Sequence, residues 1–187
     1  MKRIIILLLA STISISLFSQ SFNVVPKVKS FELGTSLNMH STYNIKPVGP
    51  NAQFDMAWQV SGFGGKAKAY ISVPLGYCSY SIGGPDSAGN ASLLYYGWTI
   101  RHNLSRDKAW IPFLSYSLLL DQLWLSGFEG HVIGHETRFD YGYDYKPADS
   151  KITYLFKIEY SHRTYPALGN KHSNMMDLAA FKLGIRF

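Results

Sequence analysis

The sequence has a single cysteine, Cys78, and few charged residues, since Asp, Glu, Lys and Arg make up only 16% of its 187 residues. One cysteine cannot form a disulfide within the chain, which excludes a small secreted fold held together by disulfides. The net charge is +6, but Lys and Arg form no basic run. The charge distribution therefore gives no support to nucleic-acid binding.

Long apolar runs are missing beyond the first twenty residues. Lys2 and Arg3 precede an apolar stretch over 4–18. This stretch has the charged start and the length of a secretory signal peptide, and it is short of the roughly 20 apolar residues of a membrane-spanning helix. We expect cleavage after Ser19, which gives a signal peptide, 1–19, and one mature domain, 20–187. An exported chain that is rich in Tyr and lacks apolar helices is typical of a transmembrane β-barrel.

The mature sequence alternates between large apolar residues and small, polar or charged ones. This pattern covers eight segments: 29–41, 51–62, 66–80, 91–103, 109–125, 132–146, 151–164 and 174–187. It is clearest over 132–146, where Phe139, Tyr141 and Tyr143 alternate with Arg138, Asp140 and Gly142. A period of two indicates strands whose two faces meet different environments. We therefore predict an all-β fold, an eight-stranded antiparallel up-and-down transmembrane barrel.

The bulky face of these strands is expected to point outward, toward lipid, because the lumen of an eight-stranded barrel is only just wide enough for side chains. The other face then fills the lumen, and buried charges there must be paired. Its charges nearly balance, with Glu32, Asp55, Asp121, Glu136, Asp140, Asp144 and Glu159 against Lys68, Arg101, Arg138, Lys157, Lys182 and Arg186. We expect a lumen closed by this network, and a narrow, porin-like pore is the alternative.

The links between the predicted strands differ in length. Those at 42–50, 81–90 and 165–173 are long, those at 63–65, 104–108 and 147–150 are short, and 126–131 is intermediate. Outer-membrane barrels have short periplasmic turns and longer external loops. If both termini are periplasmic, an even number of strands places every long link outside the cell. These patterns predict a location in the cell outer membrane.

The basic start, the apolar run and the closing Phe-Lys-Leu-Gly-Ile-Arg-Phe resemble small outer-membrane β-barrel proteins of Bacteroidetes type. The resemblance implies that the barrel-assembly machinery recognises the last strand through Phe187, and that the partners are outer-membrane lipid and lipopolysaccharide. We expect a monomer that binds no nucleic acid and no cofactor. Because architecture does not fix function, our first hypothesis is a structural or surface-interaction role without catalysis.

The end of the last hairpin carries a candidate site. His162 and Thr164 continue the outward face of 151–164, and Asp177 continues that of 174–187. In a hairpin symmetric about residues 169 and 170, His162 and Asp177 lie directly opposite, with Cβ atoms about 5 Å apart. A histidine between a carboxylate and a hydroxyl is the arrangement used for acyl transfer.

This spacing is similar to that of the lipid A 3-O-deacylase family, eight-stranded barrels whose His, Ser and Glu lie on the lipid-facing surface near the outer leaflet. Thr164 stands where that family has Ser, Asp177 where it has Glu, and Tyr165 where its Asn follows the Ser. The run His172-Ser173-Asn174 is a second, partial match. The resemblance implies a lipid A-modifying acyl hydrolase in which His162, Thr164 and Asp177 are catalytic.

The alternative for these residues is a polar rim of His162, Arg163 and Asp177 at the membrane interface. A second cluster, His131, His135 and Glu136, has residue types that bind metals. Along a strand, however, His131 and His135 share a face while Glu136 points the other way. We therefore expect no metal site there, because metal ligands must converge on one point.

Overall fold

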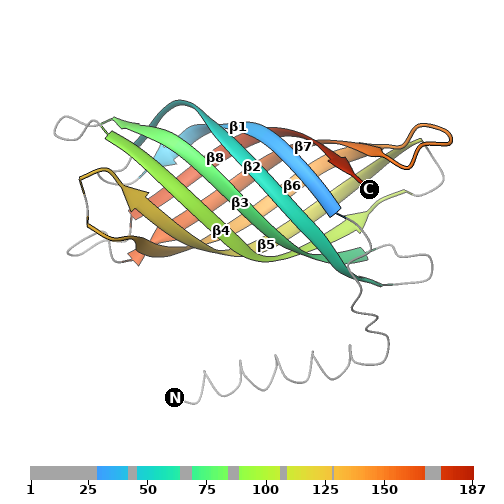
Figure 1. Ribbon diagram of the computed structural model, residues 1–187, viewed down its shortest axis with the longest axis horizontal. Helices are drawn as coiled ribbons and strands as arrows, with labels where there is room; N and C mark the ends of the chain where they lie inside the picture. Colours follow the sequence, from blue (N-terminus) through green and yellow to red (C-terminus); the bar gives the residue numbers. More distant parts are fainter. Residues whose placement is uncertain are drawn as a thin grey trace, which may run out of the picture.

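The computed structural model of the protein describes residues 29–41, 46–63, 69–83, 89–105, 109–127, 129–166 and 174–187. These residues form one closed barrel in which each strand pairs antiparallel with its neighbour in sequence and β8 pairs back onto β1 (Figure 1). The strands are β1 (Lys29–Ser41), β2 (Lys46–Phe63), β3 (Ala69–Gly83), β4 (Gly89–Asn103), β5 (Trp110–Leu125), β6 (Val132–Tyr145), β7 (Thr153–Tyr165) and β8 (Asn174–Arg186). The predicted fold class is confirmed, and the predicted signal peptide lies outside the described residues.

The two ends of the described chain meet at one end of the barrel. The Lys29 amide donates to the Phe187 carbonyl at 2.9 Å, and the Phe187 amide donates to the Lys29 carbonyl at 3.1 Å. We call this end the termini end and the opposite one the far end (right and left in Figure 1). Within the described ranges, the structure has no helix long and apolar enough to cross a membrane.

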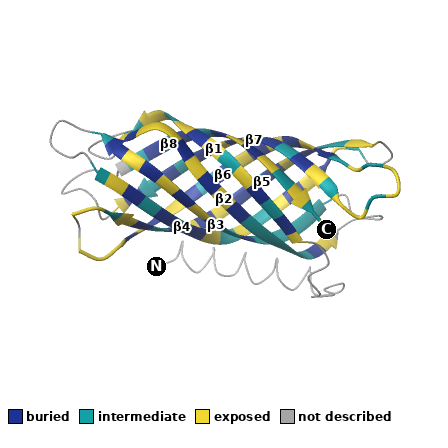
Figure 2. Cartoon of the chain, turned by 45° about the horizontal axis from the view of Figure 1, so that its top comes forward, coloured by how far each residue is buried: buried dark blue, intermediate teal, exposed yellow. Residues whose placement is uncertain are grey.

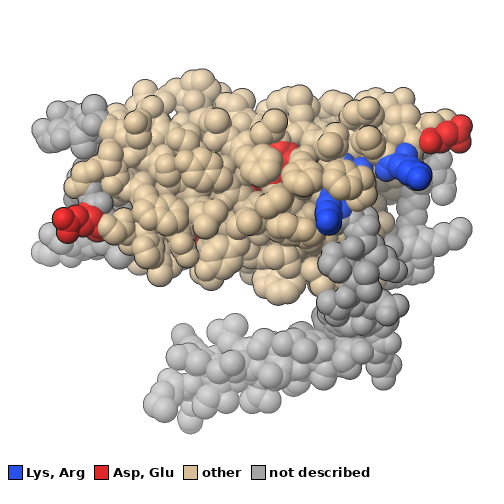
Figure 3. Space-filling model, viewed as in Figure 1, with Lys and Arg blue, Asp and Glu red and all other residues tan. Residues whose placement is uncertain are grey.

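The bulky face of the strands points outward, as predicted. Leu33, Trp98, Leu118, Phe139 and Ile158 each leave about half or more of their surface exposed, and Figure 2 shows buried and exposed residues alternating along the strands. Between its two ends, the surface in Figure 3 carries few charged side chains. The polar face of each strand therefore lines the lumen.

The predicted alternation of long and short links is wrong. β2 begins at Lys46 and β3 ends at Gly83, so both strands run into the links expected at 42–50 and 81–90. The Pro- and Gly-containing start of β2 stays in the sheet because Gly49, with a φ of 74°, lies at a bulge between Val48 and Ala52. Link length consequently does not tell the two ends of this barrel apart.

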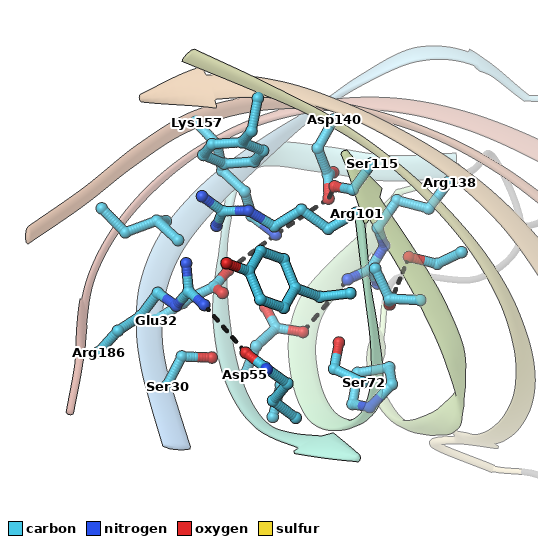
Figure 4. A pocket seen from close by; sticks show the side chains of 18 residues that line it. Ser30, Glu32, Asp55, Ser72, Arg101, Ser115, Arg138, Asp140, Lys157 and Arg186 are labelled. Carbon is cyan, nitrogen blue, oxygen red and sulfur yellow. Dashed lines mark hydrogen bonds and ion pairs between the residues drawn. The ribbon is translucent and has the colours of Figure 1, made fainter. Parts of the chain in front are cut away.

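The termini half of the lumen holds the expected ion-pair network (Figure 4). Asp55 is its centre: it accepts hydrogen bonds from Tyr95 Oη at 2.7 Å, Arg138 Nη1 at 3.2 Å and Lys182 Nζ at 2.5 Å. Nearer the termini end, Arg101 and Arg186 both bind one carboxylate oxygen of Asp144, at 2.6 and 2.5 Å. Lys68, predicted to join this network, lies outside the described residues.

The far half of the lumen contains an apolar plug, which packs beside the buried ion pair of Arg163 with Glu136. The plug consists of Cys78, Tyr80, Ile82, Ala91, Leu93, Tyr95, Leu119, Leu123, Val132, Tyr165 and Met176. Tyr95 joins the two halves, because its ring lies over Gly76, where an added Cβ would meet the ring at 2.1 Å, while its hydroxyl reaches Asp55. The free space left in the termini half is about 70 Å³. A lumen filled in this way does not favour the narrow-pore alternative.

Replacing Asp55 by Asn should destabilise the barrel by about 3–5 kcal/mol, because Arg138 and Lys182 would lose a buried counter-charge. The measurement is the urea midpoint of protein refolded in lipid vesicles, followed by the heat-modifiable mobility of the barrel on gels. Asp149→Asn is the matched control, since Asp149 is exposed in the turn after β6 and Asn tolerates its φ of 61°. Equal midpoints for the two variants would contradict the role given to Asp55.

Reconstituted protein should show no discrete conductance steps in planar lipid bilayers, because the plug closes the far half of the lumen. A general porin in the same bilayers serves as the positive control. Regular single-channel steps that scale with protein concentration would refute the closed lumen.

Candidate functional site

Asp177 is an exception on the outward face of the barrel. It shares that face of β8 with Phe181, and its side chain is 21% exposed. Among the described strand residues, it is the only outward-facing Asp, Glu, Lys or Arg that is not the first residue of its strand. The other strand charges either begin a strand, as Lys29 and Lys46 do, or point into the lumen. A single carboxylate therefore stands alone on an otherwise uncharged wall.

The predicted pairing of His162 with Asp177 is present. The two residues face one another in the β7–β8 register, and His162 Nδ1 lies 2.7 Å from Asp177 Oδ1. Two residues along β7, Thr164 Oγ1 lies 3.4 Å from His162 Nε2. Strand geometry explains this row, because residues two apart on one strand share a face and the partner strand adds a third side chain opposite them.

The hydrogen bonds fix which nitrogen of His162 carries its proton. An ionised carboxylate only accepts hydrogen bonds, so Nδ1 must be the donor toward Asp177 when the imidazole is neutral. Nε2 then has a free lone pair directed at Thr164. The 3.4 Å separation is longer than an ordinary hydrogen bond, but catalytic contacts without substrate are commonly loose and shorten in the complex. The three side chains are therefore arranged as a nucleophile, a base and a carboxylate that orients the base.

Tyr160 adds a fourth member that sequence reasoning missed. Its hydroxyl donates to Asp177 Oδ1 at 2.9 Å, the same oxygen that meets His162. Tyr160 precedes His162 by two on the same face of β7, so the alternation pattern contained the signal. A tyrosine also fits the bulky outward face, so alternation alone does not distinguish Tyr160 from the tyrosines of the apolar wall.

Arg163 does not belong to this cluster, which corrects the polar-rim alternative. It lies between His162 and Thr164 in sequence and points the opposite way, fully buried in the lumen. There its Nε lies 3.1 Å from Glu136 Oε2. Strict alternation along β7 is the reason, and the outward rim is left with His162 and Asp177.

An apolar groove lies on the outer wall beside the cluster. Its volume is about 640 Å³. The floor is low at Ala179, because this small residue pairs with Tyr160 on β7 and Leu37 on β1, both of which are large. The groove is lined by Thr35, Leu37, Met39, Leu114, Phe139, Asp140, Tyr141, Ile158, Tyr160, Glu159, Ala179, Ala180 and Phe181. Tyr160 is thus a wall of the groove and a partner of Asp177.

The other candidate residues from the sequence do not form a site in the described part of the structure. His135 is exposed on the outer face, whereas Glu136 is buried inside and binds Arg138 Nε at 2.8 Å. His131 lies beside Trp124, with ring centroids 5.8 Å apart. Within the described part of the chain, no three His, Cys, Asp or Glu side chains could hold a metal ion. His172 and Ser173 of the second partial match lie outside the described residues.

Solved structures of other proteins share this fold. Neisserial surface protein A superposes with a TM-score of 0.55 at 11% identity, covering 85% of this chain and 94% of that one. Outer membrane protein OprG from Pseudomonas aeruginosa has a TM-score of 0.53 at 11% identity, with 85% and 93% covered. The outer membrane enzyme PagL has a TM-score of 0.53 at 13% identity, with 83% and 97% covered.

This chain therefore has the fold of small outer-membrane β-barrels, and its structural neighbours are outer-membrane proteins. At these identities the likeness concerns the fold alone. No protein-family model and no curated protein sequence matches the chain. The expected kinship with Bacteroidetes-type proteins stays a prediction.

Proposed function

We propose that the protein is an outer-membrane acyl hydrolase that cleaves an ester of a membrane lipid on the outer wall of its barrel. The observation that carries this proposal is the hydrogen-bonded row Asp177–His162–Thr164 on the outward face. A charged side chain facing lipid is costly and is usually retained for function. A polar rim at the membrane interface would account for Asp177 and His162, but it does not require Thr164 beside His162 Nε2.

The row supports a two-step acyl transfer. Thr164 Oγ1 attacks the ester carbonyl while His162 Nε2 takes the hydroxyl proton, and Asp177 stabilises the imidazolium that forms. The C–O bond of the ester then breaks, and His162 gives the proton to the departing alcohol. Water, activated by the same Nε2, hydrolyses the acyl-threonine and restores the hydroxyl. The products are an alcohol on the lipid backbone and a free fatty acid.

The groove supports a substrate with an acyl chain. It is apolar, opens on the outer wall and touches the cluster through Tyr160. Its volume falls within the roughly 300–1,000 Å³ typical of small-molecule sites. If the termini end is periplasmic, the cluster faces the outer leaflet, where the acyl esters belong to lipid A. We therefore propose lipopolysaccharide as the substrate, as the resemblance to the deacylase family implied.

His162→Ala and Thr164→Ala should each lower the rate of ester cleavage by about 10³-fold or more, because removing one member disables such a row. Lipid A from cells expressing each variant would be compared by mass spectrometry for loss of one acyl chain. His102→Ala is the matched control, since His102 is exposed on the outward face of β4 far from the cluster.

Thr164→Ser should keep or raise the rate, because a primary hydroxyl is less hindered by its Cβ than the β-branched one. If the wild-type protein leaves both lipid A and synthetic acyl esters intact, the hydrolase is refuted and the non-catalytic role stands. Activity that survives in Thr164→Ala and disappears in His162→Ala would instead mean that His162 activates water directly.

Ala179→Leu should raise the KM for long-chain esters severalfold and leave that for short-chain esters nearly unchanged, because the added side chain fills the floor of the groove. Initial rates with p-nitrophenyl butyrate and p-nitrophenyl myristate in micelles measure this. Ala52→Leu is the control, since Ala52 is exposed on the outer face of β2 outside the groove. An equal effect on both esters would remove the groove from the substrate site.

A further inference from the structure

Tyr160 belongs to two sites at once. Its ring forms part of the apolar groove and is 41% exposed, while its hydroxyl donates to Asp177 Oδ1. In the sheet, Tyr160 pairs with Phe139 on one side and with Ala179 on the other. The missing bulk at Ala179 leaves the β8 side of the ring open to whatever occupies the groove.

Asp177 depends on few groups for its orientation. In the sheet it faces His162 on β7 and His40 on β1, and its Oδ1 receives the hydrogen bonds from His162 and Tyr160. The Asp177 side chain is 21% exposed, and these two donors give its Oδ1 a fixed direction. Two hydrogen bonds on one oxygen fix the direction of the carboxylate and, through Nδ1, the plane of the imidazole.

We propose that Tyr160 is a positioning residue that makes hydrolysis depend on the length of the bound acyl chain. This inference rests on the proposed hydrolase function. A long chain in the groove packs against the open side of the Tyr160 ring and confines it to the rotamer that hydrogen-bonds Asp177. Asp177 then holds His162 Nε2 toward Thr164. A short chain leaves the ring mobile, and the row is aligned for a smaller fraction of the time.

The consequence is a preference expressed in kcat as well as in KM. Binding energy from a remote part of a substrate accelerates the chemical step only when it is used to align the reacting groups. A groove that merely held the chain would change KM alone. The hydroxyl of Tyr160 is the one atom that distinguishes these two cases.

The test compares Tyr160→Phe with the wild-type protein on p-nitrophenyl butyrate and p-nitrophenyl myristate. Phe keeps the groove wall and removes the hydrogen bond. We expect kcat for the myristate ester to fall about tenfold, with its KM changed less than about twofold, as for loss of one hydrogen bond to a charged group. The ratio of kcat values for the long and short esters should fall toward one. Tyr160→Leu, which also removes most of the wall, should in addition raise the KM of the myristate ester.

Tyr154→Phe is the matched control, because Tyr154 is an exposed outward tyrosine on the same strand and lies outside the groove. Heat-modifiable gel mobility verifies that each variant forms the barrel. If the wild-type protein is active and Tyr160→Phe keeps both its kcat and its chain-length ratio, the inference is overturned and the hydrolase stands. If the wild-type protein cleaves neither ester nor lipid A, the proposed function fails and the inference fails with it.

Discussion

The charge of Asp55 has to be neutralised inside the barrel, and the rest of the structure depends on how this is done. The carboxylate lies on β2 and receives donors from β4, β6 and β8, so its contacts connect distant parts of the wall across the lumen. Buried ions are tolerated only with such complete pairing. Paired charges fill the lumen together with an apolar plug in its far half, which leaves the bulky aromatic and aliphatic face for the outside.

The outer wall is nearly free of charge, whereas the lumen is rich in charged pairs. The row of His162, Thr164 and Asp177 is the exception on the outer wall. Inside, a carboxylate meets Lys and Arg side chains. Outside, Asp177 forms hydrogen bonds with a tyrosine hydroxyl and an imidazole, neither of which carries a permanent charge. A lysine partner would hold the carboxylate more strongly, but it would leave no base with a free lone pair. The choice of partners is what separates a site able to move a proton from a structural ion pair.

Period-two alternation was enough to predict the strand number, the inward and outward faces, and the whole extent of β1. It also predicted the pairing of His162 with Asp177, because a hairpin's centre fixes its register. It did not predict the bulge at Gly49, since two extra residues in a strand leave no mark on composition. The groove at Ala179 was missed because its depth depends on Leu37, far away in sequence and adjacent only once β1 and β8 close the barrel. The apolar plug was missed because alternation gives the side of a residue and says nothing of its height in the lumen.

At Arg163, the two faces of β7 lie in different environments, the lumen on one side and the outer wall on the other. His162 and Thr164 on one side and Arg163 on the other are consecutive in the chain, yet they share no environment. Arg163 takes part in the packing of the lumen, whereas His162 and Thr164 lie on the outer wall. Substitutions at 162 and 164 can therefore change the chemistry of the outer wall without changing the packing of the lumen.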